Sequence, residues 1–69
     1  NPVIDELEIK IVSPGKNQII ISDGFGKQVE HIQNVQNSIK ISMSAYDSGC
    51  YFIEVRMKDR SVIHKVIKE

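Results

Sequence analysis

Alternation of apolar and polar residues with a period of two is the feature that most constrains this chain. It is clearest in the segment 51–58, whose charged residues begin at Glu54. Successive side chains of a β-strand point to opposite faces, so this pattern predicts a strand with one face in a core and the other in water. The residues expected to face the core here are Tyr51, Ile53, Val55 and Met57.

The rest of the chain repeats this arrangement of short strands and turns. Strand patterns occupy residues 7–11, 19–21, 27–32, 39–43 and 62–68. Turn-prone clusters separate them, at 13–17, 23–26, 34–37, 45–49 and 58–61. Short strands with turns every ~8–12 residues, and no helical pattern, predict an all-β fold: a small antiparallel Ig-like β-sandwich of six to seven strands.

Size and charge narrow the classes of function. A chain of 69 residues has room for one small domain. The net charge of zero disfavours nucleic acid as a partner, because such binding rests on a positive excess. Residues 1–34 carry three basic and five acidic side chains, and residues 35–69 carry six and four. Apolar runs fall well short of the ~18–20 residues of a membrane span, so no transmembrane segment is expected.

The glycine-rich loop and the acidic residues near the start do not suggest catalysis. Gly24 and Gly26 flank Phe25 in a pattern superficially like a phosphate-binding loop, but such loops precede a helix, and here a strand follows. A hairpin turn is the better interpretation, with Phe25 folded back onto the core; a contact at the loop tip is the alternative. Glu6 and Glu8 share the solvent face of a strand, an ordinary place for charges.

The histidines and the single cysteine do not form a recognisable active site either. His31 and His64 lie in strand segments, and a small sandwich has little room for the cleft that a catalytic triad needs. We expect His64 to be half-buried. Cys50 has no partner for an internal disulfide and is expected to be a small buried hydrophobe, with a reactive thiol or an intermolecular bridge as the alternatives. No enzyme, cofactor or metal site is expected.

The order of motifs along the chain does resemble a known family. Asn1-Pro2 opens the chain, and Asp23 with Gly26-Lys27 forms an Asp-x-x-Gly-Lys turn. A Ser-Gly-x-Tyr turn, with Gly49 and Tyr51, precedes the longest strand, and 62–68 is a terminal strand of aliphatic residues and lysines. This combination resembles the type A C-terminal sorting domain of the type IX secretion system of Bacteroidetes-type bacteria. Four residues depart from the family pattern: Ser22, Ala45, Tyr46 and Cys50.

The resemblance implies a secretion signal. Residues 1–69 would be a single C-terminal domain, excised from a longer secreted protein, that directs an N-terminal passenger through the outer membrane. The implied partners are the type IX outer-membrane translocon, its shuttle components and a sortase-like peptidase, which cleaves the domain from many relatives and attaches the passenger to the cell surface. The implied location is the periplasm in transit, then the cell surface or the medium.

Two groups of residues are expected to carry the signal. Gly49 and Tyr51 would fix a turn, with a role in folding alone as the alternative. The terminus, Lys65, Val66, Ile67, Lys68 and Glu69, would be read by strand addition or edge contacts. Asp23, Gly26 and Lys27 would form a structural turn. A passive Ig-like or fibronectin-like structural or adhesion module is the alternative function. Cleavage, weak self-association through an edge strand and the role of Cys50 stay open.

Overall fold

The computed structural model describes residues 2–3, 5–12 and 15–69. Asn1, Ser13 and Pro14, which belong to the predicted opening and first turn, lie outside these residues. The described residues form seven strands and no helix. They are β1 (Pro2–Val3), β2 (Glu6–Lys10), β3 (Asn17–Asp23), β4 (Gln28–Val35), β5 (Ser38–Ser42), β6 (Gly49–Arg56) and β7 (Ser61–Lys68).

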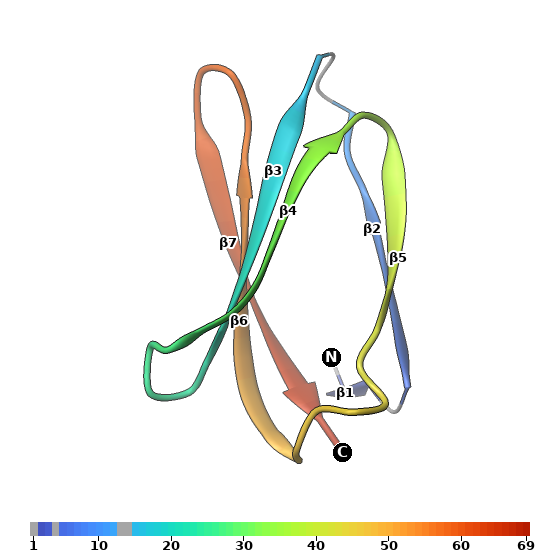
Figure 1. Cartoon of the computed structure of the whole chain (residues 1–69), viewed down its shortest axis with the longest axis vertical. Helices are drawn as coiled ribbons and strands as arrows, with labels where there is room; N and C mark the ends of the chain where they lie inside the picture. Colours follow the sequence, from blue (N-terminus) through green and yellow to red (C-terminus); the bar gives the residue numbers. More distant parts are fainter. Residues whose placement is uncertain (1, 4, 13–14) are drawn as a thin grey trace.

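Two sheets of unequal width face each other (Figure 1). The larger sheet, sheet A, has the strand order β1-β7-β6-β3-β4, and the smaller, sheet B, consists of β2 and β5. This confirms the expected all-β, Ig-like sandwich. One pairing differs from the antiparallel expectation: β1 pairs with β7 in parallel, matching Pro2 with Ile67 and Val3 with Lys68. Two residues are too few to show an alternating pattern, so β1 was not expected as a strand.

The alternation of β6 sets the position of the core. Tyr51, Ile53 and Val55 are buried on one face, and Met57 packs against them just beyond the strand. This confirms the predicted core face of the segment. Because β6 pairs antiparallel with β3 on one side and with β7 along eight residues on the other, its inner face lies at the middle of the sandwich.

Strand β3 is the most buried strand of sheet A. Ile19 and Ile21 are fully buried in the core, and Ile20, on the opposite face, is only 8% exposed. A run of β-branched residues suits such a position because it packs well on both faces of a pleated sheet. Asn17 begins β3 rather than ending the preceding turn, and its side-chain nitrogen donates to the carbonyl of Val35 at 3.0 Å.

Sheet B covers the core from the other side. Leu7 and Ile9 of β2 and Ile39 and Ile41 of β5 point inward, and the strands pair in the register Leu7–Ile41 and Ile9–Ile39. Met43, just after β5, is fully buried. These residues confirm the core faces predicted for 7–11 and 39–43. None of the described segments forms a helix long and apolar enough to cross a membrane.

Three predictions about single side chains were wrong. Phe25 does not fold back onto the core; it is fully exposed at the tip of the β3–β4 turn, which is too tight to reverse its direction. His64 is exposed rather than half-buried, because sheet B does not extend over that part of β7. Cys50 is half-buried rather than buried, since it lies on the outer face of β6, away from the core.

Candidate recognition site

Most of the predicted motif residues come together at one end of the sandwich, where β1 and the end of β7 also lie (Figure 1). Asp23 stands opposite Tyr51 in the β3–β6 pairing, and Gly49 stands opposite Lys68 in the β6–β7 pairing. The Asp23 turn and the Gly49 turn together line a hollow of about 440 Å³. Motifs separated by 26 residues in the sequence are therefore neighbours in space.

The turn at Asp23 is closed by its own carboxylate. Oδ1 of Asp23 accepts hydrogen bonds from the backbone N–H groups of Phe25 at 2.9 Å and Lys27 at 3.0 Å. Gly26 has φ +86°, a conformation that only glycine adopts without strain. An aspartate at the first position and a glycine three residues later are thus what this hairpin needs, which explains the Asp-x-x-Gly-Lys pattern as turn chemistry.

The turn at Gly49 is fixed by backbone conformation and by Tyr51. Gly49 has φ +149°, which a side chain at this position would disfavour even though the space around it is open. The hydroxyl of Tyr51 donates to the carbonyl of Asp47 at 2.7 Å, tying the loop to the strand that follows it. A Cβ on Gly24 would lie 3.4 Å from the carbonyl oxygen of Cys50, so the two turns also touch each other.

Tyr46 adds a contact that the sequence pattern did not identify. Its ring packs on Tyr51 with the centroids 5.2 Å apart, and its hydroxyl donates to Oε1 of Glu30 at 2.7 Å. Burial, and after it the hydrogen bond and charge of Glu30, raise the pKa of Tyr46. The signal was an aromatic residue in an otherwise small and polar loop.

The terminal strand β7 presents two different faces. Val66 and Lys68 point inward and are 7% and 8% exposed. Nζ of Lys68 donates to the backbone oxygen of Glu69 at 2.8 Å. Lys65 and Ile67 point to the outer face of sheet A, where both are exposed. The predicted terminus therefore divides between side chains that complete the core and side chains available to a partner.

The outward residues of β7 belong to a larger apolar surface, which we call the outer patch: Phe52, Ile63 and Ile67, with Cys50 and Lys65 among them. The β6–β7 register places Cys50 opposite Ile67 and Phe52 opposite Lys65. Phe52, Ile63 and Ile67 are 38%, 63% and 40% exposed. Phe52 and Ile63 were not predicted as site residues; the signal was the apolar pairs 62–63 and 66–67, which break strict alternation.

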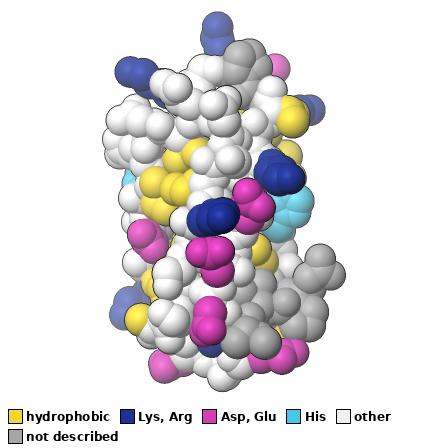
Figure 2. All heavy atoms as spheres, turned by 90° about the vertical axis from the view of Figure 1, so that its right-hand side faces the viewer, with side chains coloured by type: hydrophobic (Ala, Val, Ile, Leu, Met, Phe, Trp, Pro, Cys, Tyr) yellow, Lys and Arg dark blue, Asp and Glu magenta, His cyan; other side chains and the backbone are white. Residues whose placement is uncertain are grey.

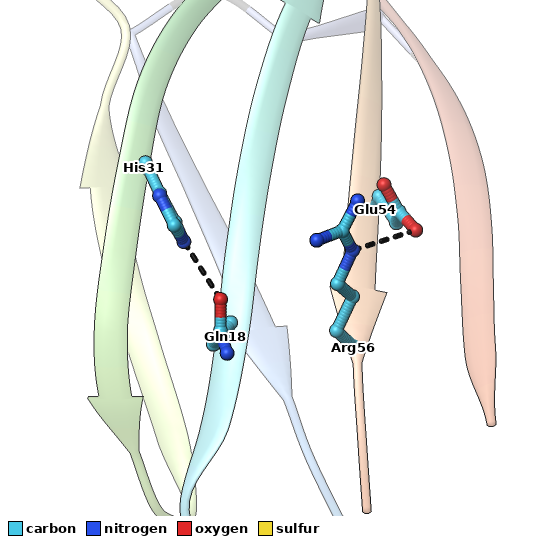
Figure 3. Close-up of polar contacts among 4 residues, drawn as sticks. All are labelled: Gln18, His31, Glu54 and Arg56. Carbon is cyan, nitrogen blue, oxygen red and sulfur yellow. Dashed lines mark hydrogen bonds and ion pairs between the residues drawn. The ribbon is translucent and has the colours of Figure 1, made fainter. Parts of the chain in front are cut away.

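Polar side chains elsewhere on this outer face make contacts with one another (Figure 3). His31 and Gln18 are joined across β4 and β3 at 2.8 Å, between Nε2 and Oε1. Nε of Arg56 lies 3.1 Å from Oε2 of Glu54. The exposed apolar side chains of β6 and β7 on this face are those of the outer patch, which runs along β7 from Ile63 to Ile67 and includes Phe52 near the start of β6.

Within the described residues no group of three or more histidine, cysteine, aspartate or glutamate side chains is placed to hold a metal ion.

A family model described as a secretion system C-terminal sorting domain matches residues 1–69 of the chain. No curated protein and no solved structure matches it.

Proposed function

The chain belongs to the family of secretion system C-terminal sorting domains, which are sorting signals for type IX secretion, and we propose that the export machinery reads it through the outer face of β7. The match covers all 69 residues, so the resemblance seen in the motifs is confirmed. Domains of this family belong to proteins exported to the cell surface or secreted, and the family is not one of enzymes.

The observation that carries the proposal is the division of β7 into two faces. Val66 and Lys68 are buried and hold the strand in place, whereas Lys65 and Ile67 are free to be contacted without unfolding. Contiguous exposed apolar surface on a small domain is typical of an interaction site. The outer patch has this character, and Lys65 at its centre gives it a positive charge that favours an acidic, apolar partner surface.

In this proposal the other motif residues position the patch. Asp23, Gly26 and Lys27 form one turn, and Gly49 and Tyr51 form the adjoining one that begins β6. Since β6 carries β7 along eight residue pairs, a distorted Gly49 turn would displace Cys50 and Phe52 relative to Ile67. These residues would act in recognition through geometry, while Lys65, Ile67 and the exposed Glu69 would be contacted directly.

The wider pathway is also part of the proposal. The domain would follow an N-terminal passenger into the periplasm, be bound by the translocon and its shuttle components, and direct the passenger to the surface or the medium. A sortase-like peptidase would then cleave it and attach the passenger to the surface. The domain would be the substrate in each step. This role needs a folded, well-presented surface and no reactive group.

An export assay with two variants of exposed residues tests the proposal. A fluorescent reporter would carry an inner-membrane signal peptide and residues 1–69 at its C-terminus, in a type IX-competent strain and in a translocon-deficient one. We expect Ile67→Ser to reduce export by about tenfold, as loss of a buried apolar contact at an interface would. Val29→Ser is the matched control, because the exposed fraction of Val29, 42%, is close to the 40% of Ile67, but Val29 lies on β4 and outside the outer patch.

Three outcomes would refute this proposal. Export that is the same in both strains would mean that the domain is not a working signal and would favour a structural module. Equal loss of export in Ile67→Ser and Val29→Ser would deny the outer patch a special role. Unchanged export after removal of residues 65–69, with the reporter still exported in the competent strain alone, would place the signal elsewhere in the domain.

A further inference from the structure

One long side of the sandwich is open, between β2 and β7. Within the described part of the chain, β2 pairs only with β5, and β7 pairs with β1 only at Ile67 and Lys68. A groove of about 280 Å³ lies between these two unpaired edges. Its apolar lining is provided by Leu7, Ile9, Ile53 and Val66, and its polar lining includes Glu8 and His64.

Part of the inner face of β7 is not covered by sheet B. Val62, His64 and Val66 alternate along the same face, but only Val66 is buried; Val62 is 37% exposed and His64 is exposed. Sheet B has two strands where sheet A has five, so nothing in the described structure covers this end of β7. One more strand beside β2 would cover Val62 and His64 and fill the groove, because packed sheets lie ~10 Å apart.

We propose that the groove binds an extended segment of a partner protein, which adds to the free edge of β2 as a third strand of sheet B. The occupant is an extended strand because no strand of the described residues pairs with this edge of β2, and such an edge offers a row of backbone N–H and C=O groups. Every second side chain of that segment would point inward onto Val62 and Val66, and must be aliphatic. The intervening side chains would point outward, beside those of β2.

Glu6 and Glu8 favour lysine or arginine at the two outward positions of the partner that lie opposite them, whereas the third outward charge of β2, Lys10 at its end, is basic. Glu6 and Glu8 are exposed on the outer face of sheet B, where charged side chains gather (Figure 2). Glu8 stands opposite Lys40 of β5, but Glu6 stands opposite Ser42, with no basic residue across the pair. A strand added on the other side of β2 would place its outward residues directly opposite Glu6 and Glu8, where opposite charges are favourable.

The edge of sheet A at β4 is unsuited to the same role. In its pairing with β3, β4 has one extra residue between Ile32 and Val35 and another between Gln28 and Glu30. Asn34, in the first of these bulges, has φ +62°. Bulges bend and twist an edge so that another strand cannot pair along it. β2 pairs with β5 in continuous register over all five residues and has no such protection.

The test uses short peptides and the chain of residues 1–69. A peptide of about nine residues that alternates valine with lysine spans the ~17 Å of a five-residue strand with room at each end. One control peptide has glutamate in place of lysine. Another has N-methyl groups on alternate backbone amides, which removes the donors that a strand needs. We expect the lysine peptide alone to bind, and to slow hydrogen exchange of backbone amides within Glu6–Lys10.

A charge reversal identifies the contacting residue. Glu6→Lys should weaken binding of the lysine peptide about fivefold, as loss of a cross-strand attraction and its replacement by repulsion would, and should strengthen binding of the glutamate peptide. Asp59→Lys makes the same change of charge in the exposed β6–β7 turn and should alter the affinity for either peptide by less than about twofold.

Several results would overturn the proposal. These are no binding at millimolar peptide, equal binding of the lysine and glutamate peptides, or binding that survives N-methylation. The proposal would also be overturned if the peptide slowed hydrogen exchange of backbone amides at the β4 edge or in the outer patch instead of within Glu6–Lys10. A peptide-independent dimer whose interface protects β2 would overturn it too, since the occupant would then be a second copy of the chain. A folded Glu6→Lys variant with unchanged affinity would exclude the assigned charge contact.

Discussion

Two valines on the inner face of β7 test whether one side of the sandwich is open. The free energy of unfolding lost on replacing each valine by alanine should differ between them. Val66 and Val62 have the same side chain on the same face of the same strand, but are 7% and 37% exposed. Replacing Val66 by alanine removes about two buried methylene equivalents and leaves a cavity, for a loss of ~2 kcal/mol. At Val62 the burial is partial and water fills the space, so the loss should be ~1 kcal/mol.

These values translate into a clear shift in thermal unfolding. A loss of 1 kcal/mol lowers Tm by ~4–8 °C in a domain of this size, so Val66→Ala should lower it by ~8–16 °C and Val62→Ala by ~4–8 °C. The change in strand propensity is the same in both variants and cancels from the comparison. Unfolding followed by circular dichroism, with urea titrations as a second measurement, provides both values.

An equal or larger loss in Val62→Ala would refute the reasoning. Val62 would then have to be as well packed as Val66, and the groove beside it would have to be closed in solution. The same experiment repeated with a saturating alternating valine–lysine peptide adds an internal check. If the peptide covers Val62 as a third strand, bound peptide should raise the Tm of the parent chain by more than it raises the Tm of Val62→Ala.

Three further predictions concern the turns at the other end of the strands. Tyr51→Phe removes the hydrogen bond to the carbonyl of Asp47 and should cost ~1 kcal/mol by urea unfolding; a loss below ~0.3 kcal/mol would contradict its tying role. Asp23→Ala should cost ~1 kcal/mol, whereas Asp23→Asn, which keeps the accepting oxygen, should cost clearly less, and equal losses would exclude the turn mechanism. Because the pKa of Tyr46 is raised by folding, the unfolded chain ionises first, so stability should fall as pH rises above the ordinary tyrosine value of ~10. Tyr46→Phe should flatten that decline relative to the parent chain, and an unchanged slope between pH 9 and 11 would show that Tyr46 does not contribute to it.

The sequence predicted the fold well because alternation is a direct consequence of strand geometry. Tyr51, Ile53 and Val55 are on the core face as expected. The Ile19–Ile21 run lies, as expected, in a strand with a neighbour on each side, where all three side chains are buried. The turns were also recognisable, since Asp23 and Gly49 have conformational roles that few other residues can take.

The sequence predicted the recognition site less completely. How much of the inner face of β7 is buried depends on how far sheet B extends, and the residue pattern of its strands does not show that sheet B has only two strands in the described structure. His64 was therefore expected to be half-buried and is exposed. The outer patch needs the β6–β7 register, which brings Phe52 to the Ile63–Ile67 segment, and register is a property of the pair of strands.

The short parallel pairing of β1 with β7 has a mechanical consequence. Tension applied between the two ends of the chain would load the Pro2–Ile67 and Val3–Lys68 pairs in shear, along the strand direction. Proline has no N–H, so this junction has few bonds to resist the force. β7, by contrast, is joined to β6 by eight residue pairs. Pulling on the N-terminal end should therefore separate β1 from β7 first and leave β7 paired with β6. The domain can then extend under load and still present the outer face of β7.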